Sequence, residues 1–407
     1  MILVTAPCSS ALIGVFRGNP SQLGCFGMMN LKVIIHLIAC AGFVGVLRLV
    51  GLGSPVSAQT FSAFDQVAAQ AAAAREQGDV AHAVELYSQA LRINPKWADG
   101  WWFLGSLNYG AGSYAAGRDA LNRYLELTPN AAPALALRGL CEFETAEYSQ
   151  SLADLQQALA FGAANQPRNE QILRYHEGLL LTRVGRFDAA LDAYRGFAQK
   201  GVSNPELYVA IGLAGLRIPL FPKEVSADQQ DLVSAVGSAA FQFMSGDEQG
   251  ASKSFQSLFQ RFPTAPTVHY FYGTLLYSTD PDSSIGEFKH ELEFAPTSEA
   301  AQVMTPWALL MRNEPTEALP YARQAAESHP NVAAAQLVLG RALAETGSLP
   351  DGIQHLEQAL KIEPNNLEIH IALAKAYSRS GRDDDARRER SLCLQMTKDE
   401  TTHIAQR

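Results

Sequence analysis

Two histidine–glutamate pairs come nearest to a known catalytic spacing in this chain. A zinc-peptidase helix carries two histidines four residues apart and a glutamate beside the first, so that both imidazoles reach one metal ion. His176-Glu177 and His290-Glu291 each lack the second histidine at that distance. The spacing therefore predicts no zinc-peptidase centre.

The glycines and serines also predict no catalytic loop. Gly110-Ala-Gly112 follows a helical pattern rather than a strand, so it is not expected to hold a phosphate. Neither a phosphate-loop lysine motif nor a nucleophile-elbow serine motif occurs. The acidic run at 383–385 is expected to cap a helix, because carboxylates stabilise the positive end of a helix dipole. We therefore expect no enzyme.

The cysteines predict no metal centre and no internal disulfide. The chain has 5 cysteines, of which only Cys141 and Cys393 lie outside the segment 1–58. They are far apart along the chain, and no paired Cys or His spacing accompanies them. Both are expected to be small buried apolar residues. The sequence thus predicts neither a metal ion nor another cofactor.

A regular proline spacing indicates the elements of the fold. The separation of Pro95 from Pro129 is the same as that of Pro296 from Pro330 and of Pro330 from Pro364, at about 34 residues. Each proline follows an alanine-rich amphipathic stretch, as a helix that ends at proline would. A period of this length is typical of a helix-turn-helix repeat that stacks into a solenoid.

Several other positions recur with the prolines. Trp101-x2-Leu104-Gly105 opens one period, and Ala83-x3-Tyr87 and Ala251-x3-Phe255 occupy the second half of others. Small residues at fixed points allow two helices to approach, and large residues fill the gaps between repeats. This pattern resembles the tetratricopeptide repeat family. The resemblance implies an all-α, right-handed α-solenoid superhelix of about nine helix-turn-helix repeats.

The same positions divide the chain into two blocks. The first block is predicted at 59–204, with repeats near 64–97, 98–131, 132–165 and 171–204, and the second at 232–400, with five repeats, before a tail at 401–407. Residues 205–231 break the period and are expected to form an irregular helix plus a loop, because Ile218-Pro-Leu-Phe-Pro222 cannot lie inside a helix. This segment is either a decayed repeat that bends the stack or a binding loop.

Large aromatic side chains are predicted on the concave groove. In the family that this chain resembles, fixed positions of the first helix of each repeat line that groove. Here they hold Trp102, Tyr109, Phe143, Tyr175, Phe243, Met244, Tyr270, Tyr277, Trp307 and Met311. Such a row either binds an extended peptide, since Trp and Tyr offer contact area at low entropy cost, or forms ordinary core.

Basic residues are predicted on the same groove near the end of the chain. Arg341, Lys375 and Arg379 fall at groove positions of the last two repeats. They form either a small anion-binding end or a solvated terminal surface. The lysine, asparagine and arginine clamp by which some members of the family hold a chaperone carboxylate is absent from the first three repeats.

Composition narrows the class of partner. Hydrophobic residues make up 47% of the chain and charged residues 18%, which suits a continuous core better than disorder. The net charge is −9, so contact with nucleic acid or with an anionic lipid surface is disfavoured. We therefore expect other proteins or extended peptide segments as partners. The residues indicate no particular oligomeric state.

The segment 1–58 is predicted to direct export. Lys32 precedes an apolar run from 33 to 47, and Val56-Ser57-Ala58 offers the small residues that signal peptidase requires, so that Gln59 would be the first mature residue. Translation is expected to begin at Met28 or Met29. Two alternatives stay open: acylation of Cys40 as in a lipoprotein, and an uncleaved membrane anchor.

These inferences converge on an exported protein without catalytic activity. The mature chain resembles exported bacterial tetratricopeptide repeat scaffolds, which implies an interaction scaffold in the periplasm or outside the cell. A second hypothesis is a recruiting or regulatory subunit of an envelope enzyme whose catalytic domain is a separate chain. A third, glycan binding, needs polar residues beside the aromatic ones, and the groove positions hold few.

Overall fold

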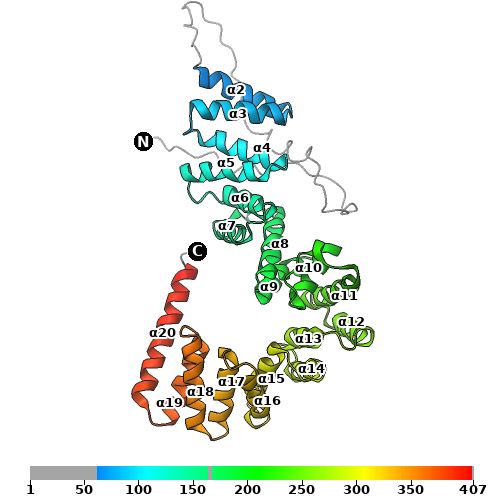
Figure 1. Cartoon of the computed structure of the whole chain (residues 1–407), viewed down its shortest axis with the longest axis vertical. Coiled ribbons are helices and arrows are strands. Elements are labelled where there is room, and N and C mark those ends of the chain that lie inside the picture. The colour runs from blue at the N-terminus through cyan, green and yellow to red at the C-terminus, as the bar shows by residue number, and fades with distance from the viewer. Residues whose placement is uncertain (1–61, 164–166, 406–407) are drawn as a thin grey trace, which may run out of the picture. The chain divides into compact units, whose positions relative to one another are not determined.

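Helices make up every regular element in the described part of the chain. The computed structural model describes residues 62–163 and 167–405 (Figure 1). The all-α fold predicted from the proline spacing is confirmed, and consecutive helices pack as antiparallel pairs. The predicted export segment lies outside the described residues.

The helices belong to two compact units that divide between Leu180 and Leu181, within α8. The first unit contains α2 (Ala63–Glu76), α3 (Val80–Ile93), α4 (Ala98–Gly110), α5 (Tyr114–Leu127), α6 (Ala132–Glu144), α7 (Tyr148–Ala160) and most of α8 (Pro167–Arg183). The second unit begins with the end of α8, α9 (Phe187–Gln199), α10 (Pro205–Gly215), a short 3-10 helix (Pro222–Glu224) and α11 (Ala227–Met244).

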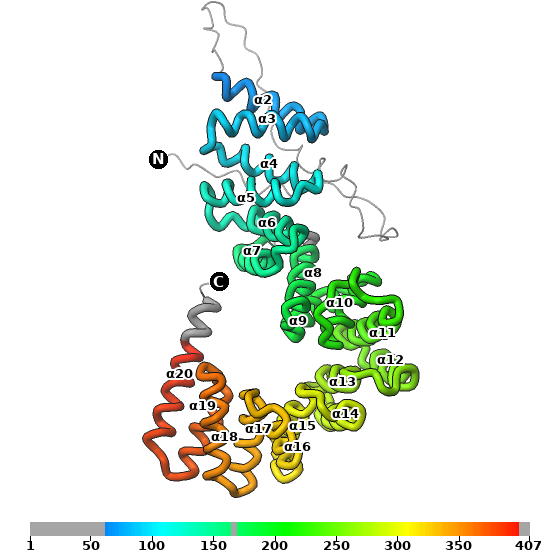
Figure 2. Tube along the Cα trace, viewed as in Figure 1, coloured from blue at the N-terminus to red at the C-terminus, as the bar shows by residue number. Residues whose placement is uncertain are grey.

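Nine further helices complete the second unit. They are α12 (Glu248–Arg261), α13 (Val268–Leu276), α14 (Pro281–Phe294), α15 (Glu299–Met311), α16 (Pro315–Ser328), α17 (Ala333–Glu345), α18 (Leu349–Ile362), α19 (Leu367–Arg379) and α20 (Asp383–Ala405). Figure 2 traces α15 to α19 as a run of helices lying side by side, each packed on the next. The last helix extends to Ala405, which is beyond the predicted start of the tail.

The turn inside most pairs contains one residue with a left-handed backbone, and the turn between α13 and α14 is an exception. Glycine occupies that position in most pairs, as at Gly78 (φ 77°) and Gly347 (φ 103°). Ala146 (φ 62°) and Asn313 (φ 61°) occupy it in two others. For a residue with a Cβ this conformation costs roughly 1–2 kcal/mol. At these two places the packing of the surrounding helices must therefore hold the turn in position.

The recurring prolines have a second role besides ending a helix. The carbonyl oxygen of the proline accepts a hydrogen bond from a side chain six residues later, in the first turn of the next helix. The donor–acceptor pairs are Trp101 to Pro95 (2.8 Å), Gln302 to Pro296 (2.5 Å), Gln336 to Pro330 (3.0 Å) and His370 to Pro364 (2.9 Å). These bonds satisfy backbone carbonyls of the turn between repeats, and so tie successive repeats together.

The segment predicted as an irregular helix and loop contains a tightly packed helix. α10 packs closely on α11, and Gly212 and Gly237 lie where the two backbones meet. The loop between them holds the 3-10 helix, and Arg183 donates to the carbonyl of Pro219 (2.9 Å) and pairs with Glu224 (3.1 Å). α11 begins at Ala227, so the predicted boundary at 231 falls inside a helix.

The apolar surface of the helices serves packing within the solenoid. No helix within residues 62–163 and 167–405 combines the length and the apolar character that a bilayer-spanning segment requires. The core consists mostly of alanine and leucine from both helices of each pair, and its largest fully buried members are Tyr87, Tyr194, Phe255, Phe271 and Phe288.

Candidate functional site

One face of each unit is lined by the first helices of successive repeats. α4 packs directly on α6 in the first unit, and in the second α11 packs on α13, α15 on α17, and α17 on α19. Helices that approach one another in this way lie on the inner side of a curved stack. We call the surface formed by these first helices the inner face of its unit.

In the first unit, the predicted groove residues form separate ring pairs. Trp102 lies 5.7 Å from the ring of Tyr124, and Tyr109 lies 5.7 Å from that of Tyr114, with both pairs packed against the core. Burial raises the pKa of Tyr109 to about 12. These rings contact second helices of their own repeats, so much of their area is already covered.

His176, which lies near the end of the first unit, is a packing residue. The His176 ring stands edge-on to Phe143 (4.9 Å) and its Nδ1 lies 2.8 Å from the carbonyl oxygen of Ile172. Burial lowers the pKa of His176, so the ring is held neutral. Its neighbours Tyr175 and Phe143 are half-buried. The pair His176-Glu177 is thus part of the packing between helices.

In the second unit, Tyr270 is a core residue. Only 7% of its surface is exposed, its ring packs on Phe288 (5.7 Å), and the Arg217 guanidinium lies 5.8 Å from it. Burial raises the pKa of Tyr270, and Arg217 opposes part of that rise. Of the two other predicted residues nearby, Met244 is buried and Phe243 is half-buried. Tyr270 is therefore not available to a partner.

The inner face from α13 to α19 carries a chain of side-chain contacts across four repeats. Trp307 Nε1 donates to the Tyr277 hydroxyl (3.1 Å), and the Arg341 guanidinium lies 5.0 Å from the centre of the Trp307 ring. Arg341 also lies 4.0 Å from the sulfur of Met311. We call the set of residues that forms this row the inner ladder; it consists of Tyr277, Trp307, Met311, Arg341, Glu345 and Lys375.

The inner ladder changes character along its length. It begins with Tyr277, Trp307 and Met311, of which Met311 is 58% exposed, and it ends with the ion pair of Lys375 and Glu345 (2.9 Å). Trp307, Arg341 and Lys375 follow one another at the repeat period of about 34 residues, so the same helical position recurs in each repeat. The result is an aromatic end joined to a charged end on one accessible surface.

The sequence predicted part of this arrangement. It placed Tyr277, Trp307 and Met311 within a longer row of groove residues, and it grouped Arg341 and Lys375 with Arg379. The structure brings the two sets together through the Arg341–Trp307 contact. It missed Glu345 and the exposed Ile371 beside the ladder, although both occupy groove positions of their repeats. The sequence had indicated only aromatic, methionine and basic residues at these positions, so an acidic and an aliphatic residue were not among them.

Comparisons with known proteins agree with this architecture. A model described as the tetratricopeptide repeat matches residues 68–132 and 307–366, and a second model of the same description matches 347–389. Comparison with curated proteins gives no match.

Solved structures of a protein named MamA show partial similarity. One, from Desulfovibrio magneticus RS-1, is 19% identical, with 40% of this chain and 94% of that chain covered and a TM-score of 0.37. Another crystal structure of MamA is 19% identical, with 40% of this chain and 96% of that chain covered and a TM-score of 0.36.

Proposed function

We propose that this chain, which matches the tetratricopeptide repeat over residues 68–132 and 307–389, is a non-enzymatic interaction scaffold of the cell envelope that binds a partner segment on the inner face of its second unit. The repeat itself supports a role in protein–protein interaction. The observation that carries the finer proposal is the inner ladder, which places an aromatic surface and a charged surface in one row.

The chemistry of the ladder indicates the kind of segment that it would bind. The exposed Met311 thioether and the Trp307 ring favour a large apolar side chain, because Met adapts its shape and Trp supplies a broad contact. Arg341 favours a carboxylate further along the same segment, whereas Lys375 is already paired with Glu345. We therefore infer an extended peptide that carries an apolar residue followed or preceded by an acidic one.

Selection from a random peptide library on the immobilised full chain tests this proposal. We expect the selected peptides to combine a large apolar residue with an acidic residue. Trp307→Ala should raise their Kd about tenfold or more, since buried Trp contacts often dominate an interface. Arg341→Ala should raise the Kd less and weaken its dependence on salt.

Matched variants on a second helix separate binding from folding. Tyr321→Ala and Arg323→Ala change an aromatic and a basic residue of the second helix α16, and neither residue belongs to the inner ladder. Both should leave the Kd within about twofold of the wild type, and all four variants should keep the helical signal in circular dichroism. Equal losses in the α15 and α16 variants, or selected peptides without an acidic residue, would count against the proposed groove.

We also propose that the protein is exported. The support is the predicted signal at 29–58, which lies outside the described residues. Amino-terminal sequencing of the protein purified from its natural cell should find Gln59 first, with or without cyclisation. An acylated Cys40 would instead make it a lipoprotein, and an intact leader would make it membrane-anchored.

A further inference from the structure

Three side chains with metal-binding atoms converge between α13 and α14 of one repeat. His269 comes from α13, and Glu287 and His290 come from α14. Each offers one ligand atom, and these atoms lie within 4.8 Å of one another. None of the three takes part in the inner ladder.

The helices bring these groups together by ordinary packing. Glu287 and His290 are three residues apart, so both project from the same face of α14. Glu291, one residue further, accepts hydrogen bonds from the backbone amides of Thr267 (2.6 Å) and Tyr270 (3.1 Å). These bonds fasten the start of α13 to α14 and thereby fix the position of His269 opposite Glu287.

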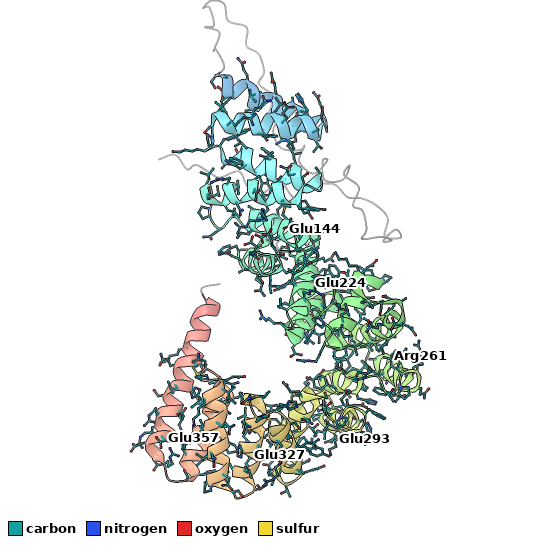
Figure 3. The ribbon with its side chains drawn as sticks, in the orientation of Figure 1. Glu144, Glu224, Arg261, Glu293, Glu327 and Glu357 are labelled. Atoms are coloured by element: carbon teal, nitrogen blue, oxygen red, sulfur yellow. The ribbon has the colours of Figure 1, made fainter. Side chains whose placement is uncertain are left out.

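The ring of His269 is held in one orientation by aromatic neighbours. It stacks on Phe259 of α12 with ring centres 3.9 Å apart and an interplanar angle of 7°. Phe294, near the end of α14, lies nearly parallel to it at 5.9 Å. In Figure 3 the labelled residues Arg261, at the end of α12, and Glu293, near the end of α14, help to locate these helices. A ring fixed in this way loses little freedom when it binds an ion.

The local charge also favours a cation. His269 Nδ1 donates to Glu287 Oε2 over 2.6 Å, and both side chains are largely buried. The neighbouring Lys289 is paired with Glu317 (2.6 Å), and Glu291 is occupied by the two amides described above. A divalent ion would take the place of the hydrogen between His269 Nδ1 and Glu287, and the neutral imidazole would then carry its one proton on Nε2.

We propose that His269, Glu287 and His290 form a binding site for a divalent transition-metal ion such as Zn²⁺. Two imidazoles and one carboxylate are a ligand set that suits zinc and its neighbours better than calcium or magnesium. Zinc bonds of about 2.0–2.1 Å place tetrahedral ligand atoms roughly 3.3 Å apart. The ligand atoms lie up to 4.8 Å apart in the structure. A rotation of the exposed His290 side chain would bring its ring nitrogen closer to the other two ligand atoms, and water would complete the coordination.

The absence of a local motif explains why the sequence predicted no metal. The residues of a zinc-peptidase motif share one helix, whereas here the third ligand comes from the preceding helix. His269 and His290 are also separated by a turn, so their proximity depends on the pairing of α13 with α14.

Titration of the untagged, metal-free full chain with Co²⁺ tests the proposal. We expect absorption bands of four- or five-coordinate Co²⁺ at one equivalent, and their loss when Zn²⁺ is added. His290→Gln and Glu287→Gln should each raise the Kd for Co²⁺ about tenfold or more. Because His290 is exposed, its replacement should leave the helical signal and the unfolding curve of the metal-free protein unchanged.

A histidine elsewhere provides the matched control. His82→Gln changes an exposed histidine of α3 and should bind Co²⁺ as the wild type does. Zn²⁺ should also raise the Tm of the wild type and of His82→Gln but not that of His290→Gln. A spectrum of hydrated Co²⁺ alone, or equal affinities in the wild type and both α14 variants, would overturn the proposed site. These outcomes leave the peptide-binding proposal unaffected, because they concern other residues.

Discussion

Gly237→Ala and Gly212→Ala are each expected to lower the free energy of unfolding of the second unit by about 3 kcal/mol or more. A Cβ atom at 237 would lie 1.7 Å from the carbonyl oxygen of Tyr208, and one at 212 would lie 1.9 Å from that of Val233. Both obstacles are backbone atoms, so no side-chain rotation relieves them. α10 and α11 would have to separate along their whole contact.

Urea unfolding of the full chain, followed by circular dichroism and hydrogen exchange, measures this effect. The matched control is Gly286→Ala in α14, where nothing lies within 4 Å of the added Cβ. That variant should be more stable by about 0.5–1 kcal/mol, because alanine favours a helix. Faster exchange should be concentrated in α10 and α11. If Gly237→Ala unfolds at the same urea concentration as the wild type, the close crossing of these helices is wrong.

The repeat period predicted most of the helices because each repeat satisfies the same local requirements. In most repeats a left-handed residue follows the first helix, a proline follows the second, and small residues recur where helices cross. The period could not predict the crossing of α10 with α11, since Gly212 and Gly237 share no motif and meet only after folding. Nor could it find the start of α11, because Ala227-Asp-Gln-Gln-Asp231 is polar and mostly exposed.

The candidate site was harder to predict than the fold. Tyr270 and Tyr277 look alike in sequence, but Tyr270 faces Phe288 and the core, whereas Tyr277 lies at the end of α13 and meets Trp307. Which tyrosine is covered depends on neighbouring helices rather than on its own position. For the same reason the sequence did not predict the proposed metal site, because its ligands belong to two helices and meet only when these pack together.

Arg138→Ala is the second change with a large expected effect, in the first unit. Its guanidinium donates to Asp154 at 2.5 and 2.7 Å and to Asn122 at 2.9 Å, and it lies 3.8 Å from Glu142. The carboxylates of Glu142 and Asp154 are only 8% and 9% exposed. Removal of the arginine leaves two buried acids without a counter-ion, which typically costs about 3–5 kcal/mol.

The free energy of unfolding of the first unit should depend on pH through Glu142. Burial, followed by the charge of Asp154, raises the pKa of Glu142 from 4.5 to about 7, while Arg138 opposes that rise. A carboxyl group with a raised pKa in the folded state stabilises the protein fully below its unfolded-state pKa and loses that contribution as the pH rises through its folded-state pKa. The wild type should therefore lose up to about 3 kcal/mol between pH 4.5 and pH 8.

Two variants make the pH dependence specific to this cluster. Glu142→Gln removes the titrating group, so the stability of the first unit should become nearly constant between pH 5 and pH 8, with a gain at the higher pH. Arg138→Ala should make the stability fall more steeply with rising pH than in the wild type. The reason is that Glu142 and Asp154 then repel each other most at high pH, where both are charged. Arg123→Ala, an exposed residue paired with Glu126, should change stability by less than about 0.5 kcal/mol at either pH. An Arg138→Ala variant as stable as Arg123→Ala at pH 8 would show that Arg138 does not neutralise these buried acids.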